Sequence, residues 1–365
     1  MNQTILFRLN ADPATGYGHL YRCMALELAL SGLGYGFAYL VNHDGSGVSE
    51  KIMGGGRRVA RLLKDATPSD EVACLEGLAD ELKPVGIVVD LLHSQEDFME
   101  AAGRCCSVVL AIDDVYGNNR NAHIVVNAGL GADRARYANM KAELLLGPEY
   151  LLIRPQYAIR REAAPAKDPS RVFISFGGSD PHKITPRVID ALNMVEHAGL
   201  KATVAVGNGY GDLKGLSARL DLAGYPFELL SGVDDLSLEM AESALAVCSV
   251  GNTAWELACV GTPSILVTFF EGQERFADGL AREGMAIYFS RSPEFNGAEL
   301  ARLVEGLLKD PARLSVMASS ALRVVDGLGA KRVAEILHLA VRERMRRIAS
   351  HGSAEPVQSL PRGSP

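Results

Sequence analysis

Short apolar runs alternate along the chain with longer segments in which apolar residues recur every three or four positions. The short runs have strand length and are apolar throughout, as in strands buried on both faces of a parallel sheet. The longer segments have helical spacing, most clearly at 21–33, 69–82 and 184–198. The expected strands are 4–9, 36–41, 85–89, 107–112, 124–127, 171–176, 202–206, 227–230, 245–250 and 264–268. This alternation predicts an α/β fold with doubly wound, mostly parallel sheets and helices on both faces.

The length of the chain, 365 residues, is enough for two domains. A polar segment that contains prolines, 156–170, has no strand spacing and is predicted to be a linker. We therefore expect an N-terminal Rossmann-like domain over 1–155 and a C-terminal Rossmann-like domain over 171–348 that ends in helices. The tail, 349–365, is rich in Gly, Ser and Pro and is predicted to be disordered.

The composition excludes several classes of protein. Hydrophobic residues make up 48% and charged residues 22%, as in ordinary globular proteins, and the net charge of -7 argues against a nucleic-acid partner. No apolar run approaches the roughly 20 residues that span a bilayer, so membrane insertion is not expected. The first residues lack a basic segment followed by an apolar one, so a signal peptide is not expected either. The six cysteines do not have zinc-site spacing. We expect a cytoplasmic protein with reduced thiols and without a metal or cofactor.

A glycine-rich turn with the sequence GYGHLYR, residues 16–22, follows the first expected strand and leads into the first helix. Ligands bind at the carboxyl ends of strands in open α/β sheets, where such a turn lies. Gly16 and Gly18 leave room for a ligand. His19 falls at the helix start, where the helix dipole disfavours imidazolium, so we expect a neutral general base. Arg22, one turn on, is suited to an anion or a carboxylate. The same pattern is also typical of a histidine that only caps its helix.

A second glycine turn opens the C-terminal half. Gly177, Gly178 and Ser179 follow the expected strand 171–176. Successive amides in such a turn form a concave nest for anions. We also expect the next helix to start at Thr185–Pro186, because threonine caps helices and proline favours their first position. A glycine turn without a ligand remains the simpler alternative.

A strand-to-helix junction further on has the same character. Gly251, Asn252 and Thr253 follow the strand 245–250, and free amides at a helix start suit a diphosphate. Glu256, one turn inside the helix, is suited to ribose hydroxyls. Gln273 follows the next strand, where its amide can hold sugar hydroxyls. The alternatives are a plain turn, an acidic residue that favours the helix N-terminus, and a solvated helix face.

Acidic residues end two strands of the first half. Asp90 follows 85–89, and Asp113 and Asp114 follow 107–112. A carboxylate there can orient His19 or bind a sugar. Helix capping or turn formation is the alternative for each residue.

Together these motifs resemble the UDP-sugar hydrolase family of pseudaminic acid biosynthesis and the spore-coat polysaccharide proteins similar to it. The resemblance runs from about residue 4 to residue 330. The residues that carry it are Gly16, Gly18, His19, Arg22, Asp90, the segment 112–114, Asn127, the segment 145–150, Arg154, the segment 174–180, Gly251, Asn252, Thr253, Glu256, Gly261 and Pro263. It implies a glycosyltransferase-B architecture, two Rossmann-like domains with the active site between them and UDP in the C-terminal one.

The resemblance also implies a reaction. The histidine of the turn, His19 here, activates water without a metal for attack at the anomeric carbon, and UDP leaves with inversion. The diphosphate and ribose contacts fall on 251–253 and Glu256. Two positions depart from the family, because Leu91 replaces a tyrosine and Gly272 an asparagine near the sugar. Each lost hydrogen bond is worth on the order of 1–3 kcal/mol in a buried site.

The resemblance, taken together with these residues, leaves three functions open. The first is a hydrolase that releases UDP from a UDP-linked, deoxy or acetamido sugar in the synthesis of a nonulosonic acid or surface polysaccharide. The second is a glycosyltransferase on the same scaffold, in which His19 deprotonates an acceptor hydroxyl. The third is a non-catalytic protein that binds nucleotide sugars. All three predict a small UDP-sugar as the partner.

Overall fold

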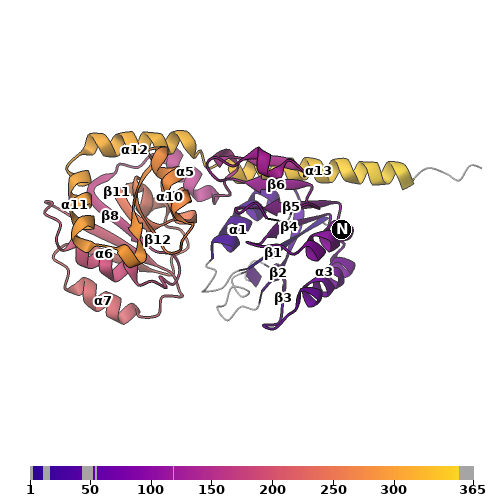
Figure 1. The fold of residues 1–365 in the computed structure, drawn as a ribbon, viewed down its shortest axis with the longest axis horizontal. Coiled ribbons are helices and arrows are strands. Elements are labelled where there is room, and N and C mark those ends of the chain that lie inside the picture. The colour runs from indigo at the N-terminus through magenta and orange to yellow at the C-terminus, as the bar shows by residue number, and fades with distance from the viewer. Residues whose placement is uncertain (1–2, 11–16, 43–51, 54–55, 118, 353–365) are drawn as a thin grey trace, which may run out of the picture.

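The structure is a computed structural model of the 365-residue chain, and it describes residues 3–10, 17–42, 52–53, 56–117 and 119–352. Gly16 and the residues 353–365 of the expected tail lie outside the described residues. The described chain forms two parallel sheets, one in each half, with helices around them (Figure 1). This confirms the predicted α/β fold.

The first sheet has the strand order β3-β2-β1-β4-β5-β6-β7, and every neighbouring pair is parallel. Its strands are β1 (Gln3–Leu9), β2 (Tyr35–Val41), β3 (Arg58–Arg61), β4 (Gly86–Asp90), β5 (Val108–Ile112), β6 (Ile124–Asn127) and β7 (Glu143–Leu146). The helices and 3₁₀ turns of this half are α1 (Gly18–Ser31), α3 (Pro68–Leu82), α4 (Glu96–Cys105), η1 (Arg134–Tyr137) and η2 (Pro148–Tyr150).

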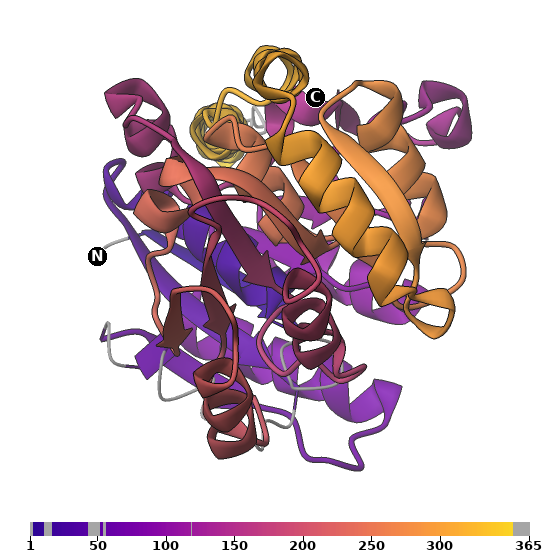
Figure 2. The same ribbon diagram turned by 90° about the vertical axis from the view of Figure 1, so that its left-hand side faces the viewer.

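The second sheet is also parallel and has the order β10-β9-β8-β11-β12-β13. Figure 2 views it from its own end of the molecule, with helices on both of its sides. The strands are β8 (Asp168–Ser175), β9 (Lys201–Val206), β10 (Phe227–Ser231), β11 (Ser243–Ser249), β12 (Ser264–Thr268) and β13 (Ala286–Arg291). The helices and the 3₁₀ turn in the C-terminal half of the chain are α5 (Pro155–Ala163), α6 (Ile184–Leu192), α7 (Leu213–Asp221), α8 (Ser237–Glu242), α9 (Asn252–Cys259), α10 (Glu274–Arg282), η3 (Ser292–Glu294), α11 (Gly297–Leu308), α12 (Pro311–Val324) and α13 (Gly329–Gly352).

The central strands are buried on both faces. In β1, Ile5 and Phe7 belong to one apolar cluster, whereas Leu6 belongs to the cluster on the opposite face. In β8, Val172 and Phe173 divide in the same way between two clusters. Because helices cover both faces, successive side chains are all apolar, and this explains the unbroken runs in the sequence.

The last helix differs from the expectation. The sequence interpretation grouped the terminal helices with the second domain, but α13 runs along the first domain (Figure 1). Its residues Val333, Leu337 and Val341 are fully buried in the same apolar cluster as Leu26 of α1. The apolar stripe of α13 therefore packs against the first domain. The helical spacing of the stripe predicts the helix but not the domain on which it packs. The helix also includes 349–352, the start of the expected disordered tail.

The predicted linker 156–170 is wrong in its local structure. Residues 155–163 form α5, with Pro155 at its first position, and β8 already begins at Asp168. Tyr157 is completely buried in the apolar cluster that includes Leu257 of α9, so α5 is part of the packed fold. The domain limits themselves, 1–155 and 171–348, stay a prediction.

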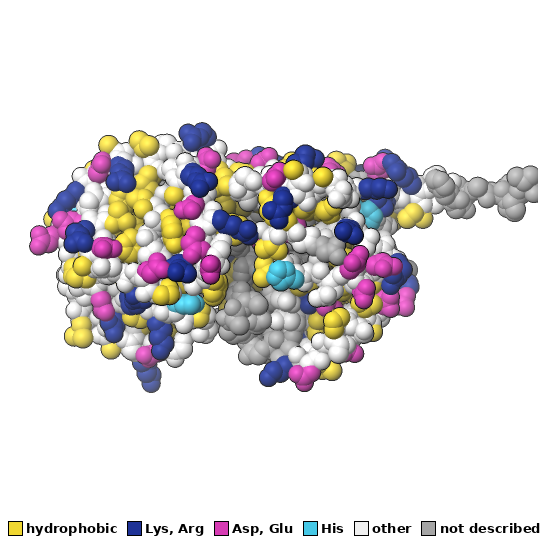
Figure 3. Space-filling view, in the orientation of Figure 1, with side chains coloured by type: hydrophobic (Ala, Val, Ile, Leu, Met, Phe, Trp, Pro, Cys, Tyr) yellow, Lys and Arg dark blue, Asp and Glu magenta, His cyan; other side chains and the backbone are white. Residues whose placement is uncertain are grey.

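The surface of the second domain carries mixed charge. On the face in Figure 3, Lys and Arg side chains are interspersed with Asp and Glu, so the net charge of -7 does not gather into one acidic patch there. Within the described ranges, none of the helices is long and apolar enough to cross a membrane.

Candidate active site between the two sheets

Each sheet has one point at which the strand order reverses, and the predicted motifs follow the strands at these points. In the first sheet β1 and β4 are neighbours, and Leu9 pairs with Asp90. In the second sheet β8 and β11 are neighbours, and Ser175 pairs with Cys248. A crevice forms at the carboxyl ends of such a strand pair, because the connections leave in opposite directions.

His19 is held by a buried carboxylate at the first of these points. Its Nδ1 lies 2.7 Å from Oδ1 of Asp90, which is completely buried. Burial alone would raise the pKa of Asp90, but the positive charge of Arg22, and then the interaction with His19, hold this pKa well below its usual range. Asp90 is therefore an ionised acceptor that favours the tautomer of His19 with its proton on Nδ1, although Nη2 of Arg22 also lies 3.1 Å from this nitrogen. The lone pair of His19 is then on Nε2, as a general base requires.

Arg22 extends this contact into a chain of ion pairs. Its Nε donates to Oδ2 of Asp90 at 2.7 Å, and its Nη1 donates to Oδ2 of Asp114, also at 2.7 Å. Asp90 was predicted to bind substrate or to orient His19, and its complete burial favours orientation. The ion pair also gives Asp114, at the end of β5, a partner that sequence reasoning missed.

At the second reversal point, the candidate binding groups are backbone amides rather than charged side chains. Gly251 precedes α9 and has φ 153° and ψ -158°, a conformation that is essentially restricted to glycine. The amides of Asn252 and Thr253 follow at the helix N-terminus, where no preceding helical carbonyl can accept from them. This arrangement has the geometry of an anion site, as the sequence predicted.

The carboxyl-end loops of the two sheets contact each other. Nδ2 of Asn252 donates to the carbonyl oxygen of Gly18 at 2.9 Å, so the start of α9 contacts the turn that carries His19. A Cβ added to Gly178 would lie 2.8 Å from the ring of Tyr17. Gly178 must therefore be a glycine for the domains to approach this closely, a role that the anion-nest prediction did not include.

The structure shows the local backbone geometry of the rest of the second glycine turn, and the predicted anion contacts of Gly177 and Ser179 stay predictions. Gly177 has φ 81°, which favours glycine, and Ser179 follows it on the same turn. The expected cap at Thr185 is wrong, because the helix α6 begins at Ile184 and the Asp180 carboxylate accepts from the amides of Ile184 and Thr185. The Thr185 hydroxyl is buried and has no hydrogen-bond partner among the described residues.

Glu256 lies where the two domains contact each other. Nη2 of Arg154 donates to its Oε1 at 3.0 Å, and the guanidinium of Arg154 also stacks over Tyr21 of α1 at 4.7 Å. Burial raises the pKa of Glu256 although Arg154 opposes the shift. The predicted ribose contact stays a prediction, and only 8% of the residue is exposed to meet a ribose.

Gln273 is engaged within its own loop. Its Oε1 accepts from the amide of Phe269 at 2.8 Å, which leaves the side-chain NH₂ for a sugar hydroxyl. The predicted sugar contact of Gln273 is not tested by this geometry.

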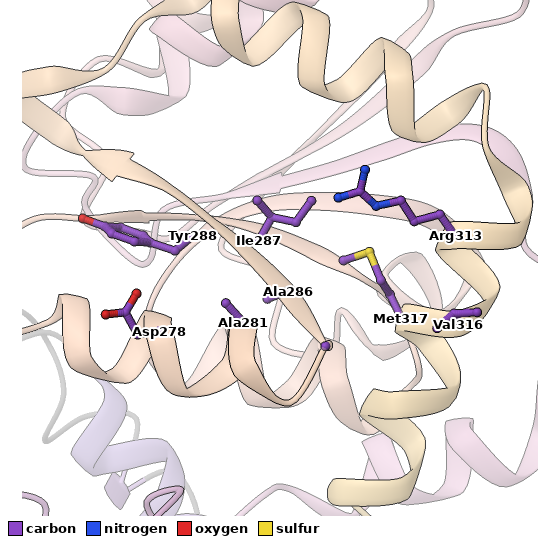
Figure 4. A pocket seen from close by; sticks show the side chains of 9 residues that line it. Asp278, Ala281, Ala286, Ile287, Tyr288, Arg313, Val316 and Met317 are labelled. Carbon is purple, nitrogen blue, oxygen red and sulfur yellow. The ribbon is translucent and has the colours of Figure 1, made fainter.

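Two cavities are of a size to consider. One, of about 220 Å³, lies between the domains and is lined by Asp114, Tyr116, Asn127, Gly129, Leu130, Gly131, Ala132, Trp255, Arg275, Phe276 and Gly279. The other, of about 550 Å³, lies in the second domain alone, between α10, β13 and α12 (Figure 4). It is larger, but none of the predicted site residues lines it. The cavity between the domains borders the ion-pair chain through Asp114. In the part of the chain that the structure describes, no group of three or more His, Cys, Asp or Glu is placed to hold a metal ion.

Several known proteins are similar to this chain over part of its sequence. No known protein-family profile matches the chain. It is 25% identical to an uncharacterized protein of Methanocaldococcus jannaschii, over 69% of this chain and 53% of that protein. It is also 25% identical to the spore coat polysaccharide biosynthesis protein SpsG of Bacillus subtilis, over 58% of this chain and 63% of SpsG.

A further relative is named as a transferase. The UDP-N-acetylglucosamine–N-acetylmuramyl-(pentapeptide) pyrophosphoryl-undecaprenol N-acetylglucosamine transferase of Acidiphilium cryptum is 30% identical over 50% of this chain and 52% of its own length. The matches therefore span between about half and two thirds of the lengths of these relatives. The specific hydrolase family is not among these names, so that part of the resemblance stays a prediction.

Solved structures show the same architecture. MurG of Acinetobacter baumannii superposes with a TM-score of 0.65 and 16% identity, over 92% of this chain and 99% of that one. Anabaena Alr3699/HepE, solved with UDP and glucose, gives a TM-score of 0.55 and 15% identity, over 92% and 100%. The fold is therefore the glycosyltransferase-B architecture, as predicted.

Proposed function

We propose that this protein is a glycosyltransferase of polysaccharide synthesis that takes a sugar from a nucleoside diphosphate donor, with UDP as the first choice of nucleotide. The observation that carries the proposal is the pairing of His19 with the buried Asp90 next to a helix N-terminus of the other domain. The names of the polysaccharide biosynthesis relative and the transferase relative support it. The domain built on the second sheet would bind the nucleotide.

The expected chemistry is a direct displacement. Nε2 of His19 takes the proton of an acceptor hydroxyl, and the hydroxyl oxygen forms a bond to the anomeric carbon of the donor sugar. The bond from that carbon to the diphosphate oxygen breaks, and its electron pair leaves with the nucleoside diphosphate. The imidazolium that forms is stabilised by Asp90.

The amides at the start of α9 would stabilise the departing diphosphate. A diphosphate oxygen gains negative charge as the bond breaks, and backbone N–H groups fixed at Asn252 and Thr253 need no rearrangement to meet it. Glu256 lies one turn further along α9, where a ribose would follow the diphosphate, and Arg154 donates to it.

The hydrolase predicted from the family resemblance uses the same groups, with water in place of the acceptor hydroxyl. Release of UDP from a panel of UDP-sugars, measured with and without a panel of mono- and disaccharide acceptors, separates the two. Release that depends on an acceptor supports the transferase. Equal release without any acceptor identifies a hydrolase, and UDP binding without turnover identifies a binding protein.

The base is tested by His19→Ala. We expect turnover to fall by roughly 10²–10⁴-fold, the usual contribution of a general base, while the dissociation constant for UDP in calorimetry stays near that of the wild type. His197→Ala is the matched control. His197 precedes β9 and so lies at the amino ends of the strands of the second sheet, away from the carboxyl ends that form the candidate site. Unchanged turnover in His19→Ala would remove His19 from the mechanism.

A further inference from the structure

The larger of the two cavities, of about 550 Å³, is an open groove on the second domain. Residues of α10, β13 and α12 line it, and we call it the α10–α12 groove (Figure 4). Ala281, Ile287 and Met317 make part of its lining apolar. None of the residues assigned to the candidate active site lines this groove, so the proposed glycosyl transfer gives it no role.

The groove combines an exposed apolar side chain with an open edge of the sheet. Val316 lines the groove from α12, and 67% of it is exposed. Ala286, Ile287 and Tyr288 line it from β13, the last strand of the second sheet. Among the described residues β13 pairs only with β12, so its outer edge is without a neighbouring strand. Apolar side chains beside an unpaired strand edge form a surface to which another protein chain can bind.

Two unpaired charges of opposite sign lie on opposite sides of the groove. Asp278 belongs to α10 and Arg313 to α12, and Ile287 lies between them (Figure 4). In the described part of the chain, neither the Asp278 carboxylate nor the Arg313 guanidinium has an ion pair or a side-chain hydrogen bond. A partner that covers the groove must therefore bring a positive charge to the α10 side and a negative charge to the α12 side.

A second copy of this chain brings these two charges in the required arrangement. A twofold axis through the middle of the groove turns the second groove end for end, so that Asp278 of each protomer faces Arg313 of its partner. The same ion pair then forms twice in one interface. The symmetry also sets the exposed Val316 of each protomer against the apolar lining of the other groove.

We propose that the α10–α12 groove is the interface of a twofold homodimer, held by two symmetric ion pairs between Asp278 and Arg313. The inference does not depend on the proposed function. The interface leaves the loops at the carboxyl ends of the two sheets uncovered, because none of the groove residues belongs to them.

Sedimentation equilibrium of the full chain over a range of concentrations tests the association itself. We expect a reversible equilibrium between monomer and dimer. Hydrogen exchange at low and high concentration then locates the contact. The amides of 284–288 and 313–317 should exchange more slowly in the dimer, whereas those of α11 should not change. A protein that stays monomeric up to about 1 mM overturns the proposal, as does a dimer that leaves exchange in the groove unchanged.

Charge reversal tests the two ion pairs. In Asp278→Arg and in Arg313→Asp, two like-charge pairs replace the two ion pairs, so each variant should dimerise about a hundredfold more weakly or worse. The double variant Asp278→Arg/Arg313→Asp restores both pairs with the charges exchanged, and its dimer should return to near the wild-type affinity. An equimolar mixture of the two single variants should also dimerise, because each meets the complementary charge in the other. Recovery on mixing shows in addition that both single variants are folded.

Glu299→Arg and Arg302→Asp are the matched controls. Both residues are exposed on α11, and neither lines the groove. Their reversals make the same changes in net charge and should leave the association constant at the wild-type value. Dimerisation of both single groove variants at wild-type affinity would overturn the proposal. Failure of both the double variant and the mixture to recover would also overturn it, because twofold pairing of Asp278 with Arg313 requires recovery in each.

Discussion

The two carboxyl edges that meet in this molecule hold their chemistry in different ways. At the edge of the first sheet, side chains do the work: His19, Arg22 and Asp90 are bound to one another by ion pairs and hydrogen bonds. At the edge of the second sheet the corresponding position carries Gly251 and the bare amides of α9.

The difference follows from what each edge has to bind. A general base must keep one tautomer and one orientation, and only neighbouring side chains can impose both. A diphosphate brings its own charge, so fixed backbone N–H groups are sufficient to hold it. Substitutions at the first edge should therefore affect both folding and turnover, whereas substitutions at the second should mainly affect the affinity for the nucleotide.

Asp90→Asn should have the largest effect. The amide cannot balance the buried Arg22, and an uncompensated buried charge costs on the order of 3–5 kcal/mol of the free energy of unfolding. Turnover should also fall strongly, because Nδ1 of His19 loses its ionised partner. Urea denaturation measures the first effect and UDP release the second. Asp190→Asn, in an exposed pair with Arg219, is the control and should change stability by less than about 1 kcal/mol. A free energy of unfolding of Asp90→Asn equal to that of the wild type would show that these ion pairs do not stabilise the fold.

Low pH should weaken the ion pairs of Asp90 at the carboxyl end of the first sheet and so lower the free energy of unfolding. Because the pKa of Asp90 is lowered in the folded protein, its ionised form stabilises the fold above the ordinary aspartate pKa of about 3.9. This contribution is lost as the pH falls below about 4 toward the lowered pKa. The difference in the free energy of unfolding between wild type and Asp90→Asn should therefore shrink from pH 5 to pH 2. A constant difference over this range would show that Asp90 titrates alike in both states.

Gly251→Ala tests the backbone edge. A side chain at φ 153° strains the backbone by roughly 1–3 kcal/mol, and relief of this strain would displace the amides of Asn252 and Thr253. We expect the dissociation constant for UDP to rise about tenfold or more, while the environment of His19 stays unchanged. Gly306→Ala, inside α11 with open space around it, is the control and should be neutral or slightly stabilising. An unchanged affinity for UDP would argue that these amides do not bind the nucleotide.

Local patterns in the sequence were enough to predict the sheets but not the way their edges meet. Every apolar run identified as a strand forms one, and in the central strands burial on both faces explains the continuous signature. β10 is an exception, because it is an edge strand in which Phe227 and Glu228 are exposed. Three strands were missed: β3 is a polar edge strand, β7 has only four residues, and β13 is an edge strand that is mostly half-buried.

The missed parts of the site share one cause. Tyr17 against Gly178, Arg154 over Tyr21 and the placement of Trp255 opposite Tyr116 all pair residues of different domains. Periodicity and turn chemistry describe only neighbours along the chain, so these pairs have no local signal. His19 and Gly251 did have one, because their motifs each follow a strand and begin a helix.

Asn252→Ala should have the smallest effect and is the sharpest test of contact between the edges. It removes the hydrogen bond from Nδ2 to the carbonyl of Gly18, worth about 0.5–1.5 kcal/mol, so stability and affinity for UDP should each change only modestly. If this bond transmits nucleotide binding to the base, UDP should slow hydrogen exchange at the amides of 18–22 in the wild type and much less in the variant. Asn193→Ala, whose contact with the Gly224 amide stays within the second domain, should keep the wild-type response. Equal protection in Asn252→Ala and wild type would show that the two edges act independently, since no other described hydrogen bond joins Asn252 to the turn of His19.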